Sequence, residues 1–190
     1  MIAAYGRRAT EGQIANEMET LTARSVSGNN YVFGDIGVSM VDTTDYSAFK
    51  ALDPFFSVIK KGLDGFVDGD HFWDFIDDDA VFEFLYDFPG WPRKLEGRAA
   101  IMEVFSGYGR NICLDSADGL IIHRGLDPRI VVLEYEGHGT VLSNGQAYNN
   151  RFASIITVEG RKVVHWRDYM DSLAAMRSLA PPERTLGSLS

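Results

Sequence analysis

The chain has 190 residues, of which 45% are apolar and 12% aromatic, a composition typical of a globular protein with one packed core. Its formal net charge of −9 argues against a nucleic-acid partner and against attachment to an anionic membrane surface. No apolar run approaches the roughly 20 residues of a membrane span, and the first residues lack the layout of a signal peptide. The single cysteine allows no internal disulfide, so we expect a cytoplasmic protein.

The chain divides by composition into three parts. Residues 1–50 are rich in glycine, serine, asparagine and threonine and show no sustained helical period. We expect them to form an N-terminal extension that is partly ordered or flexible. The regular patterns lie in residues 51–180, which we assign to one domain, and residues 181–190 are expected to form a C-terminal tail.

The first half of the domain carries helical signals. Asp53 and Pro54 are typical of the start of a helix, and apolar residues recur after them at helical spacing. A second, short helix is predicted over 70–76, and the acidic run at 77–79 is predicted to be a solvated turn. Helical spacing returns over 96–109, where we expect the next helix.

The second half of the domain alternates between apolar and polar residues, as strands do. A first strand is predicted over 80–86, and the remaining strands follow one another after residue 116. They are expected over 117–123, 130–142, 147–158 and 163–172, with a short helix over 173–180. Helices and strands that segregate in this way indicate an α+β fold, in which a curved antiparallel sheet with helices on one side encloses a small-ligand pocket.

Three stretches carry a resemblance to a known superfamily: "EGHG" at 136–139, "YNNRF" at 148–152 and "WRDYMD" at 166–171. With the order of elements, they resemble the NTF2-like superfamily and, within it, the SnoaL-like proteins. These include polyketide cyclases, limonene-epoxide hydrolases and the phenazine-biosynthesis PhzA/PhzB proteins. The resemblance covers roughly residues 50–180 and implies an NTF2-like cone, a curved antiparallel sheet wrapped around helices with an apolar pocket inside.

The resemblance also implies a role for Asp168. In these relatives the acidic residue of the last motif points into the cone and serves as an acid or a base. Burial among aromatic side chains would disfavour the charged form of Asp168 and raise its pKa, which suits acid/base catalysis. The alternative interpretation is a structural carboxylate that pairs with an arginine or a backbone amide.

Other catalytic positions of the relatives are not kept. In a gapless alignment the arginine and aspartate of the epoxide hydrolases fall on Tyr135 and Gly137. The tyrosine and asparagine that hold their attacking water fall on Phe82 and Phe84, and the histidine of the phenazine proteins falls near Val104. The resemblance therefore implies the fold and the aspartate, and neither of these two specific mechanisms.

Tyr135 and His138 are the candidates for a second catalytic group. Tyr135 has the inward parity of its strand, and its hydroxyl could polarise a carbonyl or simply form part of the wall. His138 suits proton transfer near neutral pH, but its parity is opposite, so it faces inward only if the strand bulges at the neighbouring glycines. Asn150 is expected to face inward, where it would orient the substrate or hold Asp168.

The remaining site residues are those expected to line the pocket and contact the substrate, although the same spacings would fit an ordinary core. They are Phe82, Phe84, Phe105, Tyr108, Asn150, Phe152, Trp166 and Met170. The four histidines show no metal-ligand spacing, and no dinucleotide fingerprint or nucleophile elbow is present. We therefore expect neither a metal nor a cofactor.

Together these patterns favour a cofactor-free SnoaL-like enzyme that performs acid/base chemistry, as a cyclase, isomerase or dehydratase, on a hydrophobic small molecule. One alternative is a non-catalytic ligand-binding or dimerisation module, which the loss of the relatives' partner residues favours. A weaker alternative is an epoxide hydrolase with a rebuilt site. Members of the fold often pair through the open face of the sheet, so the resemblance implies a homodimer.

Overall fold

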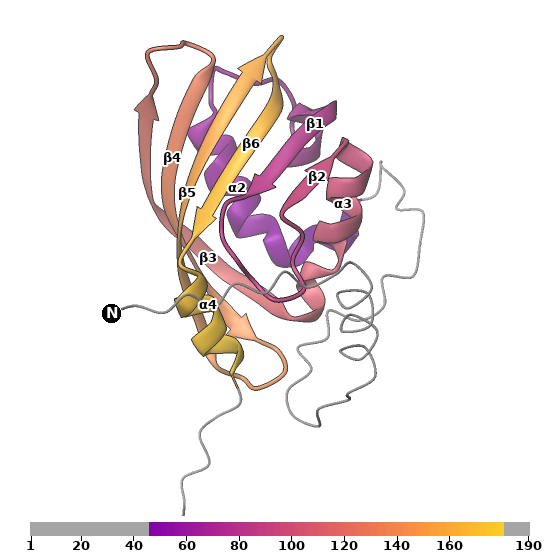
Figure 1. Cartoon of the computed structure of the whole chain (residues 1–190), viewed down its shortest axis with the longest axis vertical. Coiled ribbons are helices and arrows are strands. Elements are labelled where there is room, and N and C mark those ends of the chain that lie inside the picture. Colours follow the sequence, from indigo (N-terminus) through magenta and orange to yellow (C-terminus); the bar gives the residue numbers. More distant parts are fainter. Residues whose placement is uncertain (1–45, 181–190) are drawn as a thin grey trace, which may run out of the picture. The chain divides into compact units, whose positions relative to one another are not determined.

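The computed structural model describes residues 46–180, and Figure 1 shows how their elements are arranged. The predicted N-terminal extension lies outside the described residues as far as residue 45, as does the whole predicted tail. Within 46–180, three α-helices and a curved six-stranded sheet form an α+β fold, which confirms the predicted fold class. The helices are η1 (Ser47–Leu52), α2 (Asp53–Gly62), η2 (Phe72–Phe75), α3 (Arg98–Ser106), η3 (Tyr108–Arg110) and α4 (Ser172–Leu179), where η denotes a 3-10 helix.

The sheet has the strand order β2-β1-β6-β5-β4-β3. Its strands are β1 (Ile76–Phe84), β2 (Lys94–Glu96), β3 (Ile112–Arg124), β4 (Ile130–Val141), β5 (Ala147–Glu159) and β6 (Lys162–Met170). Every neighbouring pair is antiparallel except β1 and β6, which are parallel. The sequence pattern predicts the antiparallel meander from β3 to β6, but it does not predict this one parallel pair between distant strands.

The helices pack inside the curve of the sheet (Figure 1). Helix α2 lies against β3 and β4 and buries Ile59 and Leu63 completely. Gly62 allows this close approach, because a Cβ atom there would lie 2.7 Å from Cδ1 of Leu133 on β4. The buried apolar face of α2 therefore packs against the inner face of the sheet, and Phe55 of the same helix reaches the site described below.

The glycines of "EGHG" serve the pairing of β3 with β4. A Cβ atom at Gly139 would lie 2.2 Å from the carbonyl oxygen of Cys113, so only glycine fits at this point of contact. The register of this strand pair shifts between Leu114 and Ser116, close to the same position. A bulge of this kind bends a strand and adds to the curvature of the sheet.

Several predicted elements differ from the structure, among them β3, which starts at Ile112 and not at residue 117. The acidic run at 77–79 is not a turn but the first part of β1, where the register against β6 shifts between Ile76 and Val81 and leaves the carboxylates largely exposed. Asp78 forms an ion pair with Arg98 there. The predicted helix over 96–109 is divided, because Gly97, with a φ of 85°, separates β2 from α3.

Helix α4 starts where β6 ends, and Asp171 forms the junction. Its side chain accepts a hydrogen bond of 2.9 Å from the backbone N–H of Ala174, which caps the helix. The predicted last strand therefore ends two residues earlier than expected. Among the described residues, no helix is both long enough and apolar enough to cross a membrane.

Candidate active site

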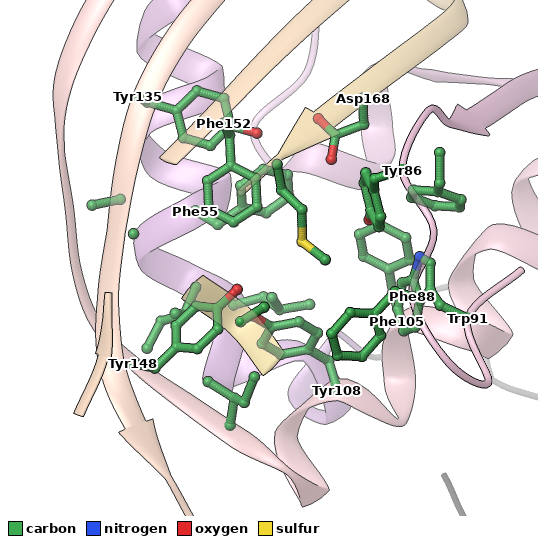
Figure 2. A pocket seen from close by; sticks show the side chains of 18 of the residues that line it. Phe55, Tyr86, Phe88, Trp91, Phe105, Tyr108, Tyr135, Tyr148, Phe152 and Asp168 are labelled. Carbon is green, nitrogen blue, oxygen red and sulfur yellow. The ribbon is translucent and has the colours of Figure 1, made fainter. Parts of the chain in front are cut away.

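A cavity of about 90 Å³ lies between the inner face of the sheet and the helices, as Figure 2 shows from close by. Ten of its nineteen lining residues are aromatic. They are Phe55, Phe84, Tyr86, Phe88, Trp91, Phe105, Tyr108, Tyr135, Tyr148 and Phe152. The wall combines five strands with α2, α3, η1, η3, α4 and the loop over 85–93, so it is assembled from segments distant in the sequence.

Asp168 projects into this cavity from β6 (Figure 2). It shares the inner face of the strand with Trp166 and Met170, as strand alternation requires. The side chain of Ser154 donates a hydrogen bond of 2.6 Å to its Oδ1, and the indole N–H of Trp166 donates one of 3.3 Å to the same atom. Both bonds end on Oδ1, which leaves Oδ2 for a ligand.

Burial raises the pKa of Asp168 to about 6, because the residue is only 8% exposed and the charged form is poorly solvated there. The hydrogen bonds from Ser154 and Trp166 act in the opposite direction and limit the increase. Among the described residues that line the cavity, none is a lysine, arginine or histidine. The carboxyl group therefore titrates close to neutrality, which suits a general acid or base.

A chain of hydrogen bonds connects Asp168 to Tyr135. Ser154 is fully buried between them, opposite Asp168 in the register of β5 and β6, and its Oγ lies 3.0 Å from the hydroxyl of Tyr135. Because the Ser154 hydroxyl donates to the ionised carboxylate, the hydroxyl of Tyr135 donates to Ser154. Burial raises the pKa of Tyr135, so this hydroxyl stays protonated. Sequence parity places Ser154 inward with Phe152, a signal that could have identified it.

A second polar group of the cavity surrounds Tyr148. Its hydroxyl accepts a hydrogen bond of 3.0 Å from Nδ2 of Asn150 and shares another with the hydroxyl of Tyr108. When the hydroxyl of Tyr108 is the donor in that pair, the proton of Tyr148 is free to donate, and Figure 2 shows this hydroxyl directed toward the cavity. Asn150 thus holds Tyr148 and has no hydrogen bond with Asp168.

The predicted lining residues fall into two sets. Phe84, Phe105, Tyr108, Phe152 and Met170 line the cavity, whereas Phe82, Asn150 and Trp166 lie outside its wall. Phe82 and Trp166 stack on each other in the buried core, with ring centroids 5.2 Å apart, because the cavity occupies only one end of the inner face. The sequence patterns did not identify Phe55, Tyr86 or Tyr148, which come from a helix, a loop and a strand.

A family model described as the SnoaL-like domain matches residues 61–166, more than half of the 190-residue chain. The chain belongs to the SnoaL-like family. This confirms the resemblance seen in the three motifs, and a solved structure of an NTF2-like protein shares the fold. The SnoaL-like match spans every strand except the last residues of β6, where Asp168 lies.

Two curated relatives share part of this SnoaL-like chain. YesE of Bacillus subtilis is 34% identical over 97 residues, which cover 51% of this chain and 66% of YesE, just under two thirds of its length. A PhzA/B-like protein of Pseudomonas aeruginosa is 23% identical over 105 residues, 55% of this chain and 74% of the relative.

Other solved structures share the fold. A candidate isomerase from Bacillus subtilis has a TM-score of 0.56 and 26% identity, over 70% of this chain and 94% of its own. A candidate polyketide cyclase from Xanthomonas campestris has a TM-score of 0.51 at 15% identity, over 70% and 96% of the two chains, and shows the fold alone.

His138 lies on the other face of the SnoaL-like sheet from Asp168. Its Nδ1 is 2.7 Å from Oδ1 of Asn149, its Nε2 is 3.3 Å from Oδ1 of Asp118, and these contacts raise its pKa. No bulge turns it inward, because β4 and β5 pair without a register shift from Ile130 to Thr140. It is therefore not among the residues that line the cavity.

This outer face also contains the described residues best placed to hold a metal ion. Asp118, Glu136 and His138 each offer a ligand atom, and these atoms lie within 4.8 Å of one another. Glu136 is engaged in an ion pair of 3.1 Å with Arg151. Histidine spacing in the sequence cannot indicate such a group, because its members come from two paired strands.

Proposed function

We propose that this SnoaL-like chain is a cofactor-free enzyme that moves a proton on a small hydrophobic molecule, with Asp168 as the general acid and base. The observation that carries the proposal is the carboxyl group itself: Ser154 and Trp166 fix one of its oxygens, and the other faces an aromatic cavity. A pKa of about 6 leaves Asp168 mostly ionised at neutral pH, in an environment that favours taking up a proton.

In the proposed reaction, Oδ2 of Asp168 removes a proton from a carbon next to a carbonyl group. The electron pair moves onto the carbonyl oxygen, and the hydroxyl of Tyr148 donates a hydrogen bond to the resulting enolate. Asp168 then returns the proton to a different carbon, which completes an isomerisation, or to a departing hydroxyl group, which completes a dehydration. Neither route needs an oxidant or a reductant.

Tyr135 has an indirect part in this mechanism. Its hydroxyl donates to Ser154, so it is not available to the substrate while Asp168 is ionised. It instead supports the orientation of Ser154, which holds the carboxylate. We therefore assign substrate polarisation to Tyr148 and a positioning role to Tyr135 and Ser154.

The test is proton exchange at the α-carbon of small ketones, from butanone to cyclohexanone, followed by NMR in heavy water. The wild-type chain should accelerate exchange, and Asp168→Asn should reduce the rate to the uncatalysed background. Asp64→Asn, which removes an exposed carboxylate outside the cavity wall, is the matched control and should behave as the wild type. Exchange that Asp168→Asn leaves unchanged would contradict the proposal, and ligand binding without exchange would indicate a non-catalytic module.

A further inference from the structure

The charge of the cavity is not balanced by the protein. Asp168 is the only acidic side chain among the described residues that line it, and no basic side chain is found among them. The groups that hydrogen-bond to Asp168, Ser154 and Trp166, are both neutral. Because an ionised carboxylate in a poorly solvated site is costly without a partner, the ionised cavity favours a ligand with a positive charge.

The rest of the wall attracts the same kind of ligand. The face of an aromatic ring is electron-rich and attracts a cation, most strongly where water is excluded. Figure 2 shows the rings of Phe55, Tyr86, Tyr108 and Tyr148 around the space in front of Asp168. A cation in this space would therefore be attracted both by the aromatic rings and by the carboxylate of Asp168.

The number of free hydrogen-bond acceptors in the cavity indicates which kind of ammonium group it can bind. A primary ammonium group has three N–H donors to satisfy, and the cavity offers few free acceptors. The hydroxyl of Tyr148 is already hydrogen-bonded to Asn150 and Tyr108, and the hydroxyl of Tyr135 is bonded to Ser154. A quaternary ammonium group has no donors, so its methyl groups need only contact with the rings.

The size of the cavity agrees with a compact head group. Its volume is about 90 Å³. An engineered apolar cavity that holds benzene measures about 150 Å³. The space therefore suits a rounded group such as trimethylammonium better than a fused ring system.

We propose that this pocket binds a compact tertiary or quaternary ammonium group, with the positive charge against the carboxylate of Asp168 and the methyl groups against the aromatic rings. The inference rests on the pocket of the proposed function and goes beyond it, because it assigns the charge and the size of the ligand and requires no turnover.

The test compares choline with 3,3-dimethylbutan-1-ol, a neutral molecule of the same shape, by calorimetric titration of the full chain at about pH 8. Choline should bind about tenfold more tightly than the alcohol, since one charged contact of this kind corresponds to about that ratio. Asp168→Asn should reduce this preference, because only the aromatic rings then attract the cation.

The pH dependence of the wild type gives a test that needs no variant. Protonation of Asp168 removes the negative charge, so the preference for choline should fall between about pH 7 and pH 5, around the pKa of about 6. The other titratable groups that face Asp168 are Tyr86, Tyr135 and Tyr148, and burial raises the pKa of each, so they remain neutral throughout this range.

Asp64→Asn controls for the attraction of any cation to a chain with a net charge of −9, and its preference for choline should equal that of the wild type. Equal or tighter binding of the alcohol, no binding of either molecule, or a preference for choline that is undiminished in Asp168→Asn would overturn the proposal. Neither probe has a proton next to a carbonyl group. Binding of choline without ketone exchange would therefore reject the proposed reaction alone, and exchange without a preference for choline would reject this inference alone.

Discussion

Replacing Asp168 with asparagine should remove a pH-dependent loss of stability from the folded chain, along with its proposed activity. The folded state holds the pKa of this carboxyl at about 6, compared with an ordinary value of 3.8. Since one pKa unit corresponds to about 1.4 kcal/mol, this difference amounts to about 3 kcal/mol.

The direction in which stability changes with pH depends on whether the folded or the unfolded state binds the proton of Asp168 more tightly. Below about pH 4, Asp168 is protonated in both the folded and the unfolded state, and the folded state has no charge to bury. As the pH rises through about 6, the folded state must accept an ionised carboxylate, and stability falls by about 3 kcal/mol. Asparagine carries no charge at any pH, so the variant should not show this loss.

The assay is urea unfolding of both proteins at intervals from about pH 4 to pH 8. The free energy of unfolding of Asp168→Asn minus that of the wild type should increase by about 3 kcal/mol across this range. The Nδ2 atom of the new asparagine gains no hydrogen-bond partner in the wild-type geometry. The resulting loss of stability is the same at every pH, so it cancels when the differences at about pH 4 and about pH 8 are compared. A difference that stays constant with pH would refute the reasoning, and Asp64→Asn controls for the loss of one negative charge.

Four further predictions concern the site, the pairing of β3 with β4, and the association of two chains. Ser154→Ala removes a hydrogen bond to the carboxylate and should raise the pKa of Asp168 above about 6, as measured by carboxyl NMR, with the pH profile of activity moving in the same direction. Tyr148→Phe removes the proposed donor to the enolate and should reduce the rate of ketone exchange by about 10²-fold or more, with an unchanged circular dichroism spectrum. Gly139→Ala places a Cβ atom 2.2 Å from a backbone oxygen of β3 and should destabilise the fold by more than about 3 kcal/mol in urea unfolding, or prevent folding. We also expect the chain to form a homodimer through the outer face of the sheet, where Tyr169 is 43% exposed; Tyr169→Asp should then reduce the mass in solution to that of a monomer, and a monomeric wild type would contradict this.

The fold could be predicted from the sequence largely because its strands are local. Strands β3 to β6 follow one another along the chain, so alternation and turn residues indicate both the strands and their antiparallel pairing. The pairing of β1 with β6 joins segments about 80 residues apart, as in the register of Phe84 with Asp168, and no local pattern specifies it. The acidic start of β1 was missed because an irregular strand start resembles a turn in composition.

The site could be predicted only where it depends on strand parity. Parity places Asp168, Tyr135 and Phe152 on the inner face, and the family resemblance identifies the acidic position. Parity alone cannot show which end of the inner face is hollow, so Trp166 was expected in the wall although it packs in the core. Tyr86 comes from a loop without regular structure, and its position depends on tertiary packing.

The parallel contact between β1 and β6 has a consequence for the order in which the molecule is made. During synthesis on the ribosome, β1 emerges long before β6, the last strand of the sheet. One edge of β1 therefore has no partner strand until β6 has been synthesised. Asp168, its support Ser154 and the stack of Phe82 on Trp166 all depend on that final addition. The pocket therefore forms at the end of folding, and a chain that stops before β6 has neither a site nor a complete sheet.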